Sequence, residues 1–157
     1  MNQVLAVHIR SQLSFFDGFL AHGALYIFHL FSLVSLPKIK KNSQMDFFCW
    51  SIKDALSINK FGIPEPSSEN CEYELASKMD IIFIPLVSFD RSGNRLGMGG
   101  GYYDSTLAEA NRGGFSDTLL VGLAHHFQEK RRLWSRSWDI KLDMIITDRE
   151  LICVKPK

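Results

Sequence analysis

Residues 80–104 read DIIFIPLVSFDRSGNRLGMGGGYYD, and this stretch decides the fold. Ile81 to Ile84 is a continuous apolar run rich in β-branched residues, which is typical of a parallel strand buried on both faces. From Tyr102 to Arg112 the apolar positions have helical spacing, and Gly113-Gly114 would end that helix. The glycine-rich turn between them is therefore predicted at the carboxyl end of a strand, where open α/β sheets bind their ligands.

The chain on the carboxyl side continues the same alternation. Leu119 to Leu123 is a second predicted buried strand. Met144 to Thr147 and Leu151 to Val154 are predicted as a terminal hairpin around Asp148-Arg149-Glu150. Strands that alternate with helices predict one α/β domain over residues 1–157, with three layers and a mostly parallel sheet.

The amino-terminal half gives less regular signals. Four segments are predicted there from composition and breakers: a strand around Leu33 to Leu36 stopped by Pro37, a strand at Met45 to Trp50, a helix capped by Ser51 through about Ile58, and a loop without regular structure from Phe61 to Asn70. In the carboxyl-terminal half, Gln128 to Trp134 is predicted as a charged surface helix or turn.

Composition excludes several classes of protein. Lysine and arginine total 18 and aspartate and glutamate 17, so the net charge of +1 argues against a dedicated nucleic-acid binder. Hydrophobic residues at 46% and charged residues at 22% fit a globular domain and exclude wholesale disorder. The cysteines, Cys49, Cys71 and Cys153, are odd in number and form no CxxC pair, which favours a reducing, cytoplasmic location without a disulfide framework.

Residues Gly18 to Pro37 contain no charged side chain and are followed by lysines. Twenty such residues approach the length that spans a bilayer, so a membrane anchor is one hypothesis. His22, His29, two serines and two glycines within the run favour the other hypothesis, a buried helix that leads into a buried strand. We expect no membrane attachment.

The glycine-rich turn indicates a phosphate ligand. Glycines at 97, 99, 100 and 101 let the backbone approach a ligand closely, and their N–H groups lead into a helix N-terminus that favours anions. Arg95 adds a fixed positive charge beside them. No lysine follows the glycines as in GxxxxGK[ST], and Tyr102 stands where GxGxxG needs its third glycine. A tight turn that merely requires glycine is the alternative.

The surrounding residues carry a family resemblance. GNRLGMGGGYYD, preceded by FD and DIIFIP, resembles the signature of the 5-formyltetrahydrofolate cyclo-ligase family, also called 5,10-methenyltetrahydrofolate synthetases. The resemblance extends to FGIPEP at residues 61–66, to VGLA at residues 121–124 with Gln128, and to WDIKLDMIIT at residues 138–147. It covers about residues 60 to 150.

The resemblance implies an ATP-dependent ring closure of 5-formyltetrahydrofolate to 5,10-methenyltetrahydrofolate, by a monomer, with Mg²⁺ as cofactor. It implies catalysis by Arg95 and ATP binding by nine residues: Arg95, Leu96, Gly97, Met98, Gly99, Gly100, Gly101, Tyr102 and Tyr103. The folate would touch Met98 to Tyr102, and the carboxylates of Asp104 and Asp139 would bind magnesium.

Each of these residues also has a structural interpretation. Asp104 would favour the helix dipole in a first helical turn, and Asp139 could cap a turn before a strand. Arg95 could form a surface ion pair with Asp90. His125 and His126 follow a strand end, where a general base could lie, but the sequence shows no partner for them.

The chain departs from the family pattern in its first third. The family begins with a basic helix whose lysine and arginine contact ATP, whereas only Arg10 precedes Lys38 here. A glutamate early in the family binds folate, whereas the first glutamate here is Glu65. Ser135 to Ser137 replace the family's proline and glutamate. A nucleotide- or phosphate-binding protein without turnover is therefore the alternative function.

Overall fold

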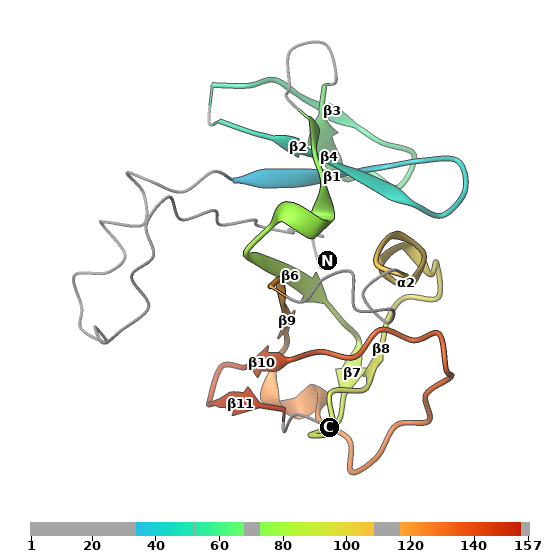
Figure 1. Cartoon of the computed structure of the whole chain (residues 1–157), viewed down its shortest axis with the longest axis vertical. Helices are drawn as coiled ribbons and strands as arrows, with labels where there is room; N and C mark the ends of the chain where they lie inside the picture. The colour runs from blue at the N-terminus through green and yellow to red at the C-terminus, as the bar shows by residue number, and fades with distance from the viewer. Residues whose placement is uncertain (1–33, 52, 68–72, 109–116, 155–157) are drawn as a thin grey trace, which may run out of the picture.

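A four-stranded sheet with the order β11-β10-β9-β6 forms the lower half of the molecule in Figure 1. The computed structural model describes residues 34–51, 53–67, 73–108 and 117–154. The strands of this sheet are β6 (Ile81–Pro85), β9 (Leu119–Leu123), β10 (Met144–Ile146) and β11 (Leu151–Cys153). β9 pairs in parallel with both β6 and β10, and β11 pairs antiparallel with β10. The predicted strands at 81–84 and 119–123 are confirmed, as is the mixed α/β class with parallel pairing at its centre.

Small antiparallel sheets form the upper half in Figure 1. One has the order β1-β2-β5, from β1 (Ser35–Ile39), β2 (Met45–Cys49) and β5 (Tyr73–Glu74). The other pairs β3 (Leu56–Ile58) with β4 (Pro64–Pro66). The strand predicted at 45–50 is confirmed, but the sequence did not predict this antiparallel region.

Pro37 lies inside β1, so the prediction that it stops the strand is wrong. On one edge of β1 the N–H groups point away from β2. Ile39 is on this edge, and its N–H donates to Glu65 Oε1 at 2.9 Å. Pro37 is two residues earlier on the same side, and β1 is an edge strand. A proline costs no ladder hydrogen bond at such a position.

The helix predicted from Ser51 through about Ile58 is wrong, because its described residues form a turn at 53–54 and then β3. The loop predicted from Phe61 to Asn70 is wrong in part, because β4 lies within it. Asn59 N–H donates to the Ile63 carbonyl, and Ser67 N–H donates to the Ala55 carbonyl. In this register the prolines of β4 fall at positions that need no N–H toward β3, so a hairpin forms where composition indicated only a loop.

Short elements complete the described chain. They are η1 (Ala76–Lys78), β7 (Ser88–Phe89), β8 (Arg95–Leu96), α2 (Tyr102–Thr106) and η3 (His126–Gln128). α2 begins at Tyr102, as predicted, but it ends at Thr106 with a turn at 107–108, so the predicted extension to Arg112 is wrong; Gly113-Gly114 lies outside the described residues. The charged segment 128–134 is a 3₁₀ turn followed by irregular chain.

The core lies against β6 and its neighbours. Ile82 and Ile84 are buried, whereas Ile81, Phe83 and Pro85 are half-buried, so within the described residues β6 is fully covered on one face only. Gly122 in β9 makes room for this packing, since a Cβ there would lie 2.6 Å from Leu142 Cδ1. Most of the uncharged run 18–37 lies outside the described residues. None of the helices that the structure describes is long and apolar enough to cross a membrane.

Candidate active site

The hairpin of β7 and β8 presents the glycine-rich loop. Asp90, between the strands, is buried and accepts hydrogen bonds from the N–H groups of Ser92, Asn94 and Leu133 and from Asn94 Nδ2. Burial alone would raise the pKa of Asp90, but these hydrogen bonds outweigh it and hold the pKa below its usual value. A charged, fully hydrogen-bonded carboxylate therefore fixes the turn that leads to Arg95.

The hairpin places the loop at the carboxyl end of β6, as predicted. Val87, two residues beyond β6, donates its N–H to the Leu96 carbonyl at 2.8 Å, and the glycines begin at the next residue. Gln128 Nε2 donates to the carbonyls of Leu86 and Val87 and ties this edge to η3.

The loop is open on its outer side. Gly99 has φ +86° and Gly101, the residue before α2, has φ +64°, both in the region that favours glycine. A Cβ built on Gly99 would have no atom within 4 Å, and Met98 beside it is 87% exposed. A Cβ on Gly100 would lie 2.8 Å from Tyr102 Cδ2, but at Gly99 no contact among the described residues excludes a side chain.

Arg95 lies beneath the loop and is bonded to Asp104. Its side chain is only 5% exposed, and Nη2 donates to Asp104 Oδ1 at 2.7 Å. The alternative pairing with Asp90 is wrong, since Asp90 is occupied by Asn94, Ser92 and Leu133. Arg95 Nε is buried and has no hydrogen-bond partner among the described residues, so the guanidinium retains unused donor capacity there.

The two tyrosines after the glycine loop lie in different surroundings. Tyr103 belongs to the core, where burial raises the pKa of its hydroxyl despite the nearby Arg95 charge. Tyr102 is half-buried, and its ring meets the Phe61 ring edge-on with centroids 6.3 Å apart. Sequence reasoning did not give Phe61 a site role, although it begins the FGIPEP segment that carries part of the family resemblance.

Asp104 and Asp139 lie on neighbouring segments. Asp104 Oδ1 accepts both from Arg95 and from Ile140 N–H at 3.0 Å, which holds the residue after Asp139 against α2. Asp139 Oδ2 accepts from Arg136 N–H at 2.7 Å, so Asp139 caps a turn. Each carboxylate keeps one oxygen without a hydrogen bond among the described residues, and one or two such oxygens suit magnesium.

His125 and His126 lie after β9 at the same edge of the sheet. His126 N–H donates to Asp148 Oδ1, and the His125 ring stacks on Phe127. His126, Glu129 and Glu150 hold possible metal ligands within 4.8 Å of one another, a group that the sequence did not predict. Arg91 donates to both glutamates, so a cation of the protein already offsets one of their two negative charges.

The fold and the loop together define an α/β protein with an open glycine-rich loop at the carboxyl edge of its parallel strands. A model of the 5-formyltetrahydrofolate cyclo-ligase family matches residues 27–148. The chain belongs to this family.

Individual relatives agree with that assignment. The 5-formyltetrahydrofolate cyclo-ligase of Haemophilus influenzae is 44% identical over 84 residues, 54% of this chain and 43% of that protein. The Escherichia coli K12 cyclo-ligase is 37% identical over 101 residues, 64% of this chain and 54% of that protein. The NMR structure of Aquifex aeolicus 5,10-methenyltetrahydrofolate synthetase superposes with a TM-score of 0.61 at 30% identity, covering 78% of this chain and 59% of that one. The chain spans about half the length of these two curated relatives.

Proposed function

We propose that the protein closes the ring of 5-formyltetrahydrofolate to give 5,10-methenyltetrahydrofolate, with conversion of ATP to ADP and phosphate. The observation that carries the proposal is the open glycine loop at the carboxyl end of β6, in a chain that belongs to the cyclo-ligase family. Within this proposal the complete domain has three layers and acts as a cytoplasmic monomer.

The chemistry proceeds in two steps that balance. The formyl oxygen attacks the γ-phosphorus of ATP, and ADP leaves with the electrons of the broken P–O bond. N10 then attacks the activated formyl carbon, inorganic phosphate leaves, and N10 gives up its proton. Phosphoryl transfer needs positioning and charge neutralisation more than covalent help from the protein.

The loop would supply that positioning. Residues 95–103 would surround the phosphates, with backbone N–H groups at the glycines, and Met98 to Tyr102 would also touch the folate. Positive charge that is already in place stabilises a transferring phosphoryl group without reorganisation. The buried Arg95, oriented by Asp104, is the cation beneath the loop.

Asp104 and Asp139 would hold magnesium through their free oxygens. Bound there, the ion would neutralise phosphate charge. The Arg95 contact on Oδ1 orients Asp104 so that its other oxygen remains available.

The test is an absorbance assay for the methenyl product with ATP, magnesium and 5-formyltetrahydrofolate. Turnover supports the proposal. ATP binding without turnover would instead establish the alternative, a nucleotide-binding family member, and no binding of either substrate would refute both.

The magnesium assignment is tested by titrating the ion against Asp104→Asn. A neutral amide oxygen is a weaker ligand for a hard dication, so the variant should need more magnesium for the same ATP affinity. The matched control is Asp148→Asn, an exposed carboxylate at the same edge of the sheet, which should titrate like the parent.

A further inference from the structure

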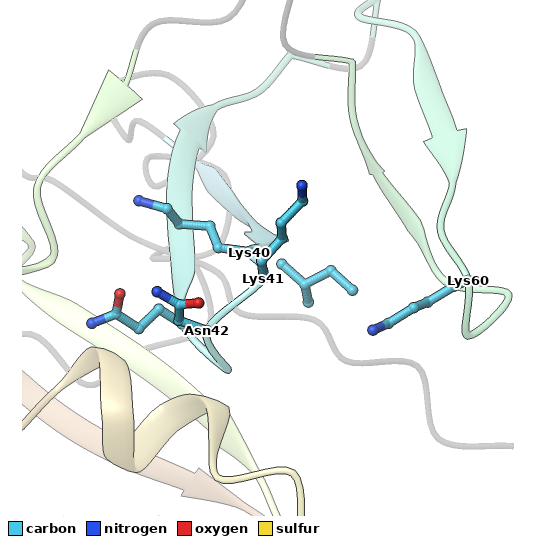
Figure 2. A pocket seen from close by; sticks show the side chains of 6 residues that line it. Lys40, Lys41, Asn42 and Lys60 are labelled. Carbon is cyan, nitrogen blue, oxygen red and sulfur yellow. The ribbon is translucent and has the colours of Figure 1, made fainter.

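Two turns of the antiparallel region border an open hollow of about 540 Å³. Ile39, Lys40, Lys41, Asn42 and Gln44 line it from the β1–β2 turn, and Lys60 lines it from the β3–β4 turn. Figure 2 shows Lys60 extending toward the β1–β2 turn. The lining therefore combines three ammonium groups with two side-chain amides.

Among the described residues, only one of these three ammonium groups has a counter-charge. Lys40 Nζ pairs with Asp46 at 3.1 Å. Lys41 and Lys60 have no carboxylate partner among the described residues, and Lys60 Nζ lies 5.0 Å from the centre of the Phe61 ring. Two unpaired ammonium groups on one hollow favour a ligand with at least two negative charges.

A buried carboxylate joins the two turns. Glu65 in β4 is 6% exposed, and its Oε1 accepts from Ile39 N–H at 2.9 Å and from Asn59 Nδ2 at 2.8 Å. Asn59 Oδ1 in turn accepts from the N–H groups of Phe61 and Ile63. The relative position of the two lysine-bearing turns is thus fixed by the fold before any ligand arrives.

The hollow is also joined to the glycine loop. Phe61, next to Lys60, contacts Tyr102, which follows the last glycine of the loop. Met45, at the end of the β1–β2 turn, donates its N–H to Thr106 Oγ1 in α2 at 2.8 Å. A ligand that extends from the glycine loop past the Phe61–Tyr102 ring pair would reach the hollow.

We propose that this hollow binds the carboxylates of the glutamate end of the folate substrate. The inference rests on the proposed function, which places the formyl end of that molecule at the glycine loop. The glutamate carries two carboxylates at the far end of the molecule from the pterin, and Lys41 and Lys60 supply the matching charge.

The experiment compares 5-formyltetrahydrofolate with 5-formyltetrahydropteroate, which lacks the glutamate, by calorimetry on the full chain. The parent should bind the glutamate form about tenfold more tightly, the size expected for two partly exposed ion pairs. The double variant Lys41→Ala/Lys60→Ala should lose that preference and bind the pteroate like the parent. The control Lys53→Ala/Lys78→Ala removes two exposed lysines outside the hollow and should keep it.

The outcomes separate this inference from the proposed function. Equal affinity for the two compounds in parent and variants would overturn the glutamate site and leave the cyclo-ligase proposal standing. A loss of tripolyphosphate or ATP binding in the lysine variant, with unchanged folate binding, would assign the hollow to phosphate and overturn the inference. Failure of the parent to bind either folate or ATP would overturn both proposals.

Discussion

Gly93 and Gly99 have nearly the same backbone conformation in different surroundings. Gly93, in the β7–β8 turn, has φ +79°, and Gly99, in the loop, has φ +86°. A Cβ on Gly93 would lie 2.6 Å from the Leu142 carbonyl oxygen and 3.2 Å from Val154, whereas a Cβ on Gly99 would meet nothing. Among the described residues, packing forbids a side chain at Gly93, whereas at Gly99 only the backbone conformation favours glycine and the outer face is open to a ligand.

The aspartates of the same two regions show the same contrast. Both oxygens of Asp90 are used by protein donors, whereas the contacts of Asp104 fall on one oxygen only. The turn at 90–94 is complete within the protein. The loop and its aspartate are left with free positions that a nucleotide and its metal could fill.

Gly93→Ala should cause the largest loss of stability. The substitution combines left-handed backbone strain with a clash against the Leu142 carbonyl, which together should cost roughly 3 kcal/mol. Urea unfolding measures this difference. An unchanged midpoint would mean that the turn relaxes freely and that the comparison with Gly99 has no basis.

Asp90→Asn should cause the next largest loss of stability, and the size of that loss should depend on pH. An asparagine offers one acceptor oxygen where N–H donors converge, so near neutral pH we expect a loss of about 2 kcal/mol. Because the folded pKa lies below the ordinary value of 3.8, the carboxylate contributes stability above that pH and loses it as the pH falls through the folded pKa. The gap between parent and variant should therefore narrow in acid, as thermal unfolding at several pH values would reveal. A gap that does not change with pH would show that the charge of Asp90 is irrelevant.

Gly99→Ala should affect stability less and ligand binding more. Strain alone should cost roughly 1–2 kcal/mol, because no atom obstructs the new methyl group. The methyl would lie where phosphate must approach, so ATP affinity by calorimetry should fall at least about tenfold. Gly62→Ala is the matched control, since Gly62 has φ +74° and equally open surroundings in the β3–β4 turn. If both variants bind ATP like the parent, the loop is only a tight turn.

The sequence predicted the central part of this fold because its signals are local. The apolar runs at 81–84 and 119–123 and the glycine loop between them required no knowledge of distant contacts. The structure confirms these strands and the place of the loop. The ATP, folate and magnesium roles of the residues around it stay predictions.

The antiparallel region escaped prediction because its cause is not local. Whether Pro37 and the prolines of β4 break a strand depends on which side of the strand each N–H faces, and pairing across the chain sets this. The structural role of Glu65, and with it the position of Lys60, could not be predicted from sequence, because it depends on Ile39 and Asn59 both donating to one oxygen of Glu65. Similarly, the sequence did not predict that Arg95 pairs with Asp104, because Asp90 is nearer in sequence and only the folded loop brings Arg95 to Asp104.

Arg91→Gln should have the smallest effect on stability. It compares an exposed charged group with a buried one. Arg91 and Arg95 belong to the same hairpin, but the Arg91 side chain is 53% exposed where that of Arg95 is 5% exposed. Arg91 bonds Glu129 and Glu150, and its hydrogen bonds hold the pKa of Glu150 below the usual value. Exposed pairs contribute little and are screened by salt, so the parent should melt only slightly above the variant at low ionic strength. In about 1 M salt, where the Debye length is roughly 3 Å, that difference should vanish. A large difference in melting temperature that persists in salt would show that the Arg91 cluster stabilises the sheet edge as strongly as the buried Asp90 stabilises its turn. Exposure would then not distinguish the two groups.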